Sequence, residues 1–230
     1  MRKLIDDGLQ FLSAAPRHTR GLRALQIAIG AMLLYRVVTE GRFAAYLWGP
    51  RGLVGGANAF RYPGWALTLL HESFGTMTRT YGLLMLLAIV GFCLVLGFHT
   101  RVAAGVAVVV LWLIMLRLPG LFDGGDNIAI LALTYMVACI SPGERVQERS
   151  LRVWMHNIGV LFIMTQLMIV YFTSGMYKAA GDLWQNGTAL YVIGQVDVFS
   201  LPSLRALLLN PSLYWRPTAR SFIRSGFQWQ

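Results

Sequence analysis

The sequence predicts an all-α fold, a polytopic membrane helix bundle with about five transmembrane helices plus interfacial helices. The first observation is composition, since 56% of the 230 residues are hydrophobic and only 13% are charged. The second is that several apolar runs approach the roughly 20 residues that a helix needs to cross about 30 Å of hydrocarbon. The third is that the basic residues, which give a formal net charge of +10, cluster between those runs. Membrane topology uses Lys and Arg in that position, so the lipid bilayer is the expected partner and nucleic acid is not.

Residues 1–21 are expected to form an amphipathic cytoplasmic helix that lies on the membrane surface. Their apolar stretch is short and is interrupted by two aspartates, which argues against a signal peptide. The membrane bundle is expected over residues 22–200. Residues 201–230 are basic and broken by prolines, and are expected to form a tail.

The first crossing is expected at residues 22–38, an apolar run that carries Gln26 and Arg36. Arg36 lies near the far end of this run, so the favoured interpretation is that its side chain snorkels to the membrane interface. The alternative is that Arg36 faces the bundle as the partner of an acidic or anionic group. Residues 39–80 are rich in Gly, Pro and aromatic residues, which predicts a loop plus a short interfacial helix.

The second and third crossings are expected at residues 81–98 and 102–116. Only three residues separate the two runs, so the helices must form a tight antiparallel hairpin. Small residues in both runs allow the helices to approach closely, namely Gly91, Gly97, Ala103, Ala104 and Gly105.

A fourth crossing is expected at residues 128–140, and Asp126 and Asn127 are well placed to cap its first turn. The acidic turn before it could be imagined as a cation loop, but it has too few ligands for calcium, so capping is favoured. The connection 141–152 is charged and cannot lie in hydrocarbon, and a fifth crossing follows at 154–178.

The short basic segments predict the orientation. The N-terminal segment, the turn containing Arg101 and the connection 141–152 fall on one side when crossings are counted, and we expect that side to be cytoplasmic. Four arginines in the long first loop oppose this assignment. The expected location is the inner (plasma) membrane, with multiple crossings, a cytoplasmic N-terminus, and Asp126 and Lys178 on the outer side.

The stretch from Gln166 to Ala189 passes from an apolar run into a polar turn, with a lone lysine, Lys178, between them. Residues three or four apart share one helix face, so a polar stripe is expected at Tyr171, Ser174, Lys178 and Asp182. Lys178 could act as a neutral amine that abstracts a proton or as an ammonium that captures an anion. The local sequence favours a third role, a structural lysine that snorkels and pairs with Asp182.

Two segments resemble a known family. YFTSGMYKAAGDLWQNGTALY is similar to the membrane motif of the HTTM domain, the bundle shared by vitamin K-dependent gamma-carboxylases and many bacterial proteins. RLPGLFDGGDNIAILAL is similar to that family's Arg-x-Pro, Gly-Gly-Asp segment before a helix. The resemblance covers roughly Arg17 to Pro202. Because the family continues into further membrane helices, the resemblance implies that the basic tail 201–230 is a shortened form of the family's C-terminus. It is nearest to the sporulation-delaying-protein B type branch, which is linked to maturation of secreted antimicrobial peptides.

The resemblance implies a site around Lys178. In the carboxylases the equivalent lysine is the base that deprotonates vitamin K hydroquinone, so Lys178 is the implied catalytic residue and a vitamin K-like quinol is the implied cofactor. The carboxylases also have a histidine near the start of the fourth helix, and this sequence has none there. The resemblance therefore supports the fold more strongly than carboxylation. The other candidate residues, expected to line a cavity or contact substrate, are Asp126, Asn127, Tyr171, Ser174, Asp182, Trp184, Arg36 and Arg117; none is expected to bind a metal.

Three functions follow from these observations. The first is assistance in the maturation or modification of a secreted antimicrobial peptide, with Lys178 at the centre. The second is a quinol-dependent enzyme, a carboxylase-like lyase or epoxidase, that uses Lys178 as base. The third is a non-enzymatic membrane assembly subunit or a truncated paralogue. The expected partners besides lipid are thus a secreted peptide or another membrane subunit.

Overall fold

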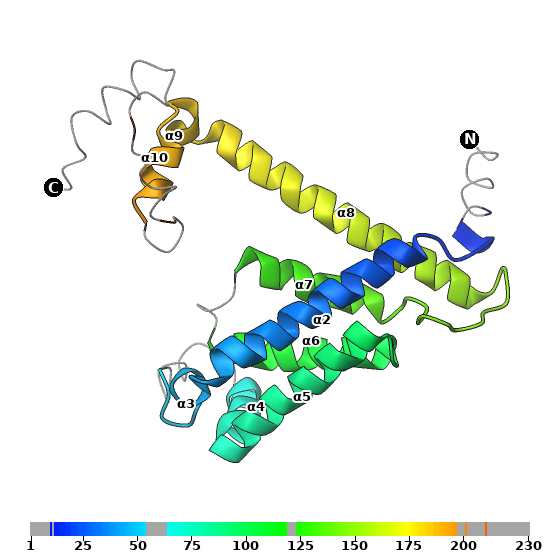
Figure 1. Cartoon of the computed structure of the whole chain (residues 1–230), viewed down its shortest axis with the longest axis horizontal. Helices are drawn as coiled ribbons and strands as arrows, with labels where there is room; N and C mark the ends of the chain where they lie inside the picture. The colour runs from blue at the N-terminus through cyan, green and yellow to red at the C-terminus, as the bar shows by residue number, and fades with distance from the viewer. Residues whose placement is uncertain are drawn as a thin grey trace. The chain divides into compact units, whose positions relative to one another are not determined.

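A computed structural model describes residues 10, 12–53, 64–118 and 123–196, together with positions 201 and 210. The described residues form helices, and no strand occurs among them (Figure 1). Their contacts divide the chain into two units, Met1–Leu167 and Met168–Gln230. The boundary falls inside one long helix. Most of the expected N-terminal helix before residue 10 and most of the basic tail after residue 200 lie outside the described residues.

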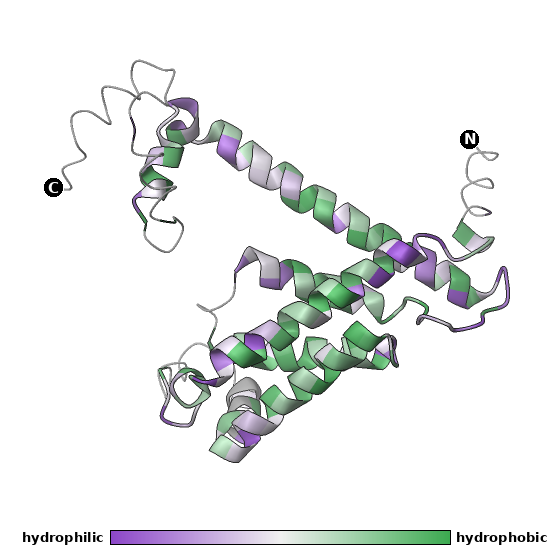
Figure 2. Cartoon of the chain, viewed as in Figure 1, coloured by the Kyte–Doolittle hydropathy of each residue, from purple (hydrophilic) through white to green (hydrophobic). Residues whose placement is uncertain are grey.

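Four helices in the described residues are long and apolar enough to cross a membrane: α2 (Thr19–Gly41), α5 (Met77–Leu96), α6 (Thr100–Arg117) and α8 (Leu151–Ala180). Figure 2 shows the hydrophobic runs along these helices. They coincide with the first, second, third and fifth predicted crossings, which confirms the all-α membrane bundle and indicates a multi-pass membrane protein.

The fourth predicted crossing is occupied by α7 (Gly124–Met136), which has 13 residues. A helix of that length extends for about 20 Å at a rise of 1.5 Å per residue, less than the hydrocarbon thickness. The described residues therefore contain four long spanning helices, whereas five were predicted. The residues directly after α7 are apolar, as in a spanning helix, but they form a turn.

The remaining helices are short. The segment between the first two crossings contains α3 (Ala44–Leu47) and α4 (Gly64–Phe74), where the sequence predicted a loop with one short helix. Two more, α9 (Asp182–Gln185) and α10 (Ala189–Gly194), belong to the second unit.

The helices α2 and α5 pack closely at a pair of glycines. A Cβ atom built on Gly30 would lie 2.7 Å from the carbonyl oxygen of Gly91, and one on Gly91 would lie 3.1 Å from the carbonyl oxygen of Gly30. Gly91 was predicted to bring the second and third crossings together, but its close partner is a glycine of α2, the first crossing. The buried face of α2 recurs every three or four residues, at Leu22, Gln26, Ile29, Leu33 and Arg36.

The predicted hairpin of the second and third crossings is confirmed. Gly97 ends α5 in the left-handed region, with φ of 82°, and its backbone N–H donates to the carbonyl of Cys93 at 2.9 Å. Glycine is favoured at this position because it has no Cβ to clash. On the first turns of α6, Ala103 and Ala104 are buried, as expected for small residues at a helix contact.

The three basic segments meet at one end of the first unit. Thr100 at the α5–α6 turn donates its hydroxyl to the hydroxyl of Ser141 at 3.0 Å. The backbone N–H of Arg17 donates to Oδ1 of Asn157, near the start of α8, at 2.8 Å. We call this region, which comprises residues 12–23, 97–101 and 137–152, the basic end.

Candidate functional site

Arg36 of α2 points into the first unit and binds Asp126 of α7. The distance from its Nη2 to Oδ2 of Asp126 is 2.8 Å, and the two side chains are only 9% and 7% exposed. Its Nε also donates to Oε1 of Glu40 at 2.9 Å. The favoured prediction that Arg36 snorkels to the interface is wrong, and the alternative of an acidic partner is right. The physical reason is that Arg36 lies on the buried face of α2, where a charge is retained only when it is paired.

Asp126 has a second role at the start of α7. The helix begins at Gly124 and its N-cap is Asp123, whose Oδ1 accepts from the backbone N–H of Asp126 at 3.0 Å. In return, Oδ2 of Asp126 accepts from the backbone N–H of Asp123 at 3.2 Å. The helix therefore starts four residues earlier than predicted, at Gly124 instead of residue 128. Asp126 takes part in the capping as predicted, but as the third residue of a capping box whose N-cap is Asp123, and Asn127 does not.

The same carboxylate oxygen of Asp126 thus accepts from Arg36 and from the backbone of Asp123. Two independent donors hold this oxygen, so its position is set by both α2 and α7. Asn127 is exposed and within the described part of the chain its side chain makes no hydrogen bond. It does not join the Arg36–Asp126 pair.

Arg117, at the end of α6, contacts the segment that follows α3. Its Nη2 donates to the carbonyl oxygen of Gly49 at 2.8 Å, and its guanidinium carbon lies 5.9 Å from the ring centroid of Phe74. Trp48, next to Gly49, is fully buried, and no hydrogen-bond partner of its Nε1 occurs among the described residues. These contacts hold the chain after α2 against α6 and α4.

Lys178 lies in the last turn of α8, in the second unit, and is exposed. Its Nζ lies 5.4 Å from the ring centroid of Trp184, at a distance typical of a cation–π contact. Tyr171 and Ser174, which precede it by seven and four residues on the same helix, are also exposed. The apolar residues beside them, Phe172 and Met176, are exposed as well, so exposure does not set the polar stripe apart from its flanks.

Asp182 departs from the predicted stripe. The helix α8 ends at Ala180, and Gly181 has an extended backbone, with φ of −77° and ψ of 129°, so Asp182 begins α9. No ion pair between Lys178 and Asp182 occurs among the described residues. The predicted pairing is therefore wrong, because the glycine breaks the helical register that would have stacked the two side chains.

The candidate residues thus fall into two groups. Arg36, Asp126, Asn127 and Arg117 belong to the first unit, whereas Lys178 and the other residues of the polar stripe and turn belong to the second. The first group contains a buried ion pair whose bonds stabilise the packing of helices. The second group carries an exposed lysine side chain.

A buried histidine that the sequence pattern did not single out lies beside the basic end. His156 of α8 is fully buried, and its Nδ1 accepts from the backbone N–H of Ile140 at 3.1 Å. Its Nε2 lies 2.9 Å from the carbonyl oxygen of Arg17. The neutral ring therefore carries its proton on Nε2 and uses both nitrogens for structure.

The neighbouring Asn157 is also buried and clamps the N-terminal segment. Its Oδ1 accepts from the N–H of Arg17, while its Nδ2 donates to the carbonyls of Leu12 at 2.7 Å and Ala15 at 2.9 Å. The sequence signal that could have identified both residues is a His-Asn pair inside an otherwise apolar run. Polar groups buried in such a run are usually hydrogen-bonded, so the pair predicts partners elsewhere in the chain.

No protein-family model, curated protein or solved structure matches this chain. The HTTM resemblance therefore stays a prediction that rests on its two sequence motifs.

Proposed function

We propose that this chain is a multi-pass membrane protein of the HTTM type that assists the maturation or modification of a secreted peptide, with Lys178 at the centre of its site. The observation that carries the proposal is the position of Lys178. It ends a 30-residue apolar helix and exposes its ammonium over Trp184. Trp residues concentrate at membrane–water interfaces, so this contact suits a site at the membrane surface, where a secreted peptide can reach it.

The contact with Trp184 supports a charged lysine. The face of an indole ring attracts a cation, so this geometry suits an ammonium that captures an anionic group. A carboxylate of a peptide, at a side chain or at the C-terminus, could accept a charge-assisted hydrogen bond from it. We therefore assign Lys178 to substrate capture and not to proton abstraction.

The basic end supports the orientation that this function needs. The arginines of the N-terminal segment, the α5–α6 turn and the connection 141–152 gather there, and such clusters mark the cytoplasmic side. Because α8 begins at the basic end, a crossing by α8 would carry Lys178 to the outer face of the plasma membrane.

A quinol-dependent reaction receives less support. It requires Lys178 as a free amine beside a quinol, whereas the contact between Lys178 and the ring of Trp184 favours the ammonium form. Tyr171, Ser174 and Lys178 do not by themselves surround an aromatic ring, so we derive no step through a quinol.

The test is mass spectrometry of the peptides secreted by host cells that carry the wild-type chain, Lys178→Ala or Lys178→Arg. We expect Lys178→Ala to reduce the mature peptide by about tenfold, the factor for loss of one charge-assisted hydrogen bond. Lys178→Arg should retain most of the product because arginine keeps the charge. Lys3→Ala, which alters the other lysine of the chain, is the matched control.

Two outcomes would contradict the proposal when all variants reach the membrane at equal levels. Unchanged maturation in Lys178→Ala would remove the central role of this residue and favour an assembly subunit. Equal loss in Lys178→Ala and Lys178→Arg would exclude simple charge capture and favour Lys178 as a base.

A further inference from the structure

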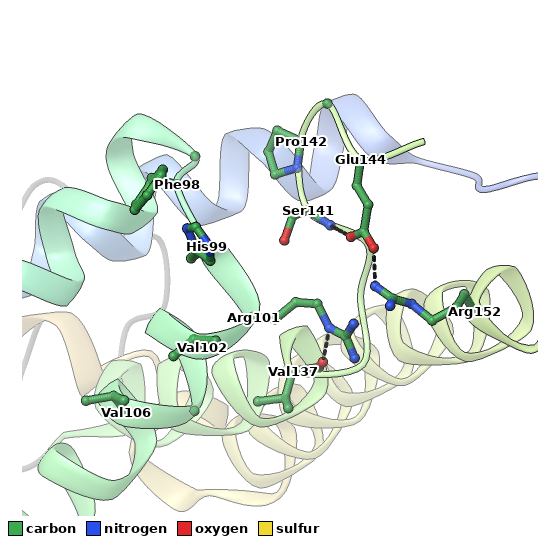
Figure 3. Close-up of a pocket in the computed structure, with 13 residues that line it drawn as sticks. Phe98, His99, Arg101, Val102, Val106, Val137, Ser141, Pro142, Glu144 and Arg152 are labelled. Carbon is green, nitrogen blue, oxygen red and sulfur yellow. Dashed lines mark hydrogen bonds and ion pairs between the residues drawn. The ribbon is translucent and has the colours of Figure 1, made fainter. Parts of the chain in front are cut away.

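A groove of about 880 Å³ opens at the basic end of the first unit. Figure 3 shows that it lies between the α5–α6 turn and the connection that follows α7. Residues of α6 and the end of α7 supply apolar side chains, and Arg101 and Arg152 extend toward each other in this view. The groove therefore combines an apolar part with a cationic part.

The apolar part consists of valines that lie on or beside a spanning helix. Val102 of α6 is 63% exposed, and Val137, directly after α7, is 40% exposed. Gly105 keeps the space between them open, since a Cβ atom there would have Val137 Cγ2, at 3.8 Å, as its nearest neighbour. Exposed valines at the end of a membrane helix are suited to contact an acyl chain.

The cationic part is held in place by bonds within the protein. Nε of Arg101 donates to the carbonyl oxygen of Val137 at 2.9 Å, which fixes the guanidinium beside the valines. Within the described residues its two Nη atoms make no hydrogen bond, so they keep donors for an external acceptor. Planar donors of this kind match the oxygens of a phosphate group.

The second arginine is anchored by a carboxylate. Arg152 forms an ion pair with Glu144, whose other oxygen accepts from the backbone N–H of Ser141 at 3.1 Å. Two guanidinium groups and one carboxylate leave the rim with a net positive charge, with His99 also at its edge. This charge complements an anionic group and not a neutral one.

We propose that this groove binds one anionic glycerophospholipid from the leaflet at the basic end. Its phosphodiester accepts hydrogen bonds from the Nη atoms of Arg101, and one acyl chain lies along Val102 and Val137. Basic pockets between membrane helices are suited to this kind of headgroup, because the cations lie at the depth of the phosphates. The assignment is independent of the role of Lys178.

The test uses the full chain purified in detergent and native mass spectrometry with phosphatidylglycerol or phosphatidylcholine. We expect retention of one phosphatidylglycerol and little phosphatidylcholine. Arg101→Gln should weaken retention about tenfold, as for loss of a charge-assisted hydrogen bond. Gly105→Leu should weaken it by filling the apolar part while leaving Arg101 unchanged. Arg145→Gln, an exposed arginine of the same connection that does not line the groove, should bind as the wild type does.

Several results would overturn the proposal. Equal retention of both lipids would show that the headgroup charge is not recognised. Equal effects of Arg101→Gln and Arg145→Gln would show a general surface charge. A further case is that glycerol phosphate competes for the groove as strongly as phosphatidylglycerol does while Gly105→Leu has no effect. That result would show that the groove binds a free anion and not a lipid. The thermal midpoint in phosphatidylcholine checks that Arg101→Gln is folded, and Gly105→Leu gives an independent result if it is not.

Discussion

Arg36 illustrates how a charge is retained inside a membrane helix bundle. Its guanidinium is bonded to Asp126 on one side and to Glu40 on the other. Removing a charge from water costs several kcal/mol, and the mutual attraction compensates only when the geometry is good. The bond between Oδ2 of Asp126 and the backbone of Asp123 helps to hold the carboxylate in that geometry.

At the residue scale, we predict that Asp126→Ala lowers the free energy of unfolding by about 3–5 kcal/mol, because Arg36 would remain buried without this carboxylate. The measurement is reversible unfolding in detergent micelles. Asp123→Ala is the matched control, since it removes the N-cap of the same helix but not the ion pair. It should cost only about 1 kcal/mol.

A double-mutant cycle separates the pair from its surroundings. Arg36→Met combined with Asp126→Leu should cost less than the sum of the two single changes, because neither charge is then left without its partner. If the losses in free energy of unfolding of the two single variants simply add in the double variant, the two side chains are not coupled, even though they lie close together.

The helices α2 and α5 depend on small residues for their contact. The carbonyl oxygens of Gly30 and Gly91 each lie within 3.1 Å of the position that a Cβ on the other glycine would take. In lipid there is little hydrophobic driving force between helices, so close packing of this kind supplies much of the attraction.

At the element scale, we predict that Gly30→Ala lowers the free energy of unfolding by about 1–3 kcal/mol. The new methyl group would meet a backbone carbonyl at 2.7 Å, which cannot move without separating the helices. Gly82→Ala on α5, where nothing lies within 4 Å, is the control and should be neutral or stabilising by up to about 1 kcal/mol. A fall in stability for Gly82→Ala equal to that for Gly30→Ala would show a general intolerance of the helices to alanine.

Local backbone signals set where α7 begins and where α8 ends. A capping box starts α7 at Gly124, while Gly181 ends the long α8 before the polar turn. Nε2 of Gln185 then donates to the carbonyl of Ala179 at 3.0 Å and satisfies one of the last carbonyls of α8. The polar turn that carries Trp184 is therefore attached to the helix that carries Lys178.

At the largest scale, three basic segments that are far apart in the sequence gather at one end of the first unit. Arg101 donates to the carbonyl of Val137, and Arg17 and its neighbours are clamped by His156 and Asn157. Arginines from three separate stretches of the first unit thus meet at the basic end, and the proposed cytoplasmic orientation of this end rests on that arrangement.

The topology can be tested by cysteine labelling in whole cells, starting from a chain in which Cys93 and Cys139 are replaced by alanine. Gln147→Cys, in the exposed connection of the basic end, should react with a membrane-impermeant maleimide only after permeabilisation. Leu53→Cys, exposed after α3, should react in intact cells. The opposite pattern would invert the orientation and place Lys178 on the cytoplasmic side. Labelling of both positions from one side would contradict the alternating arrangement.

The sequence by itself determined the fold class, four long spans and the α5–α6 hairpin. These follow from hydropathy, length and short connections, which are properties of neighbouring residues. It also determined that Tyr171, Ser174 and Lys178 share one face, because they lie on one uninterrupted helix. It did not determine where helices stop, since Asp123 and Gly181 act through backbone geometry at single positions.

Only the tertiary structure decided the direction of Arg36, because its partner Asp126 lies 90 residues away. The same holds for His156, whose bonds reach Ile140 and Arg17, and for the groove beside Arg101. A hydropathy pattern shows that a polar residue lies in an apolar run. It does not show whether a distant chain segment supplies the hydrogen-bond or ion-pair partner that offsets the free-energy cost of burying that residue. That partner exists only once the helices are packed.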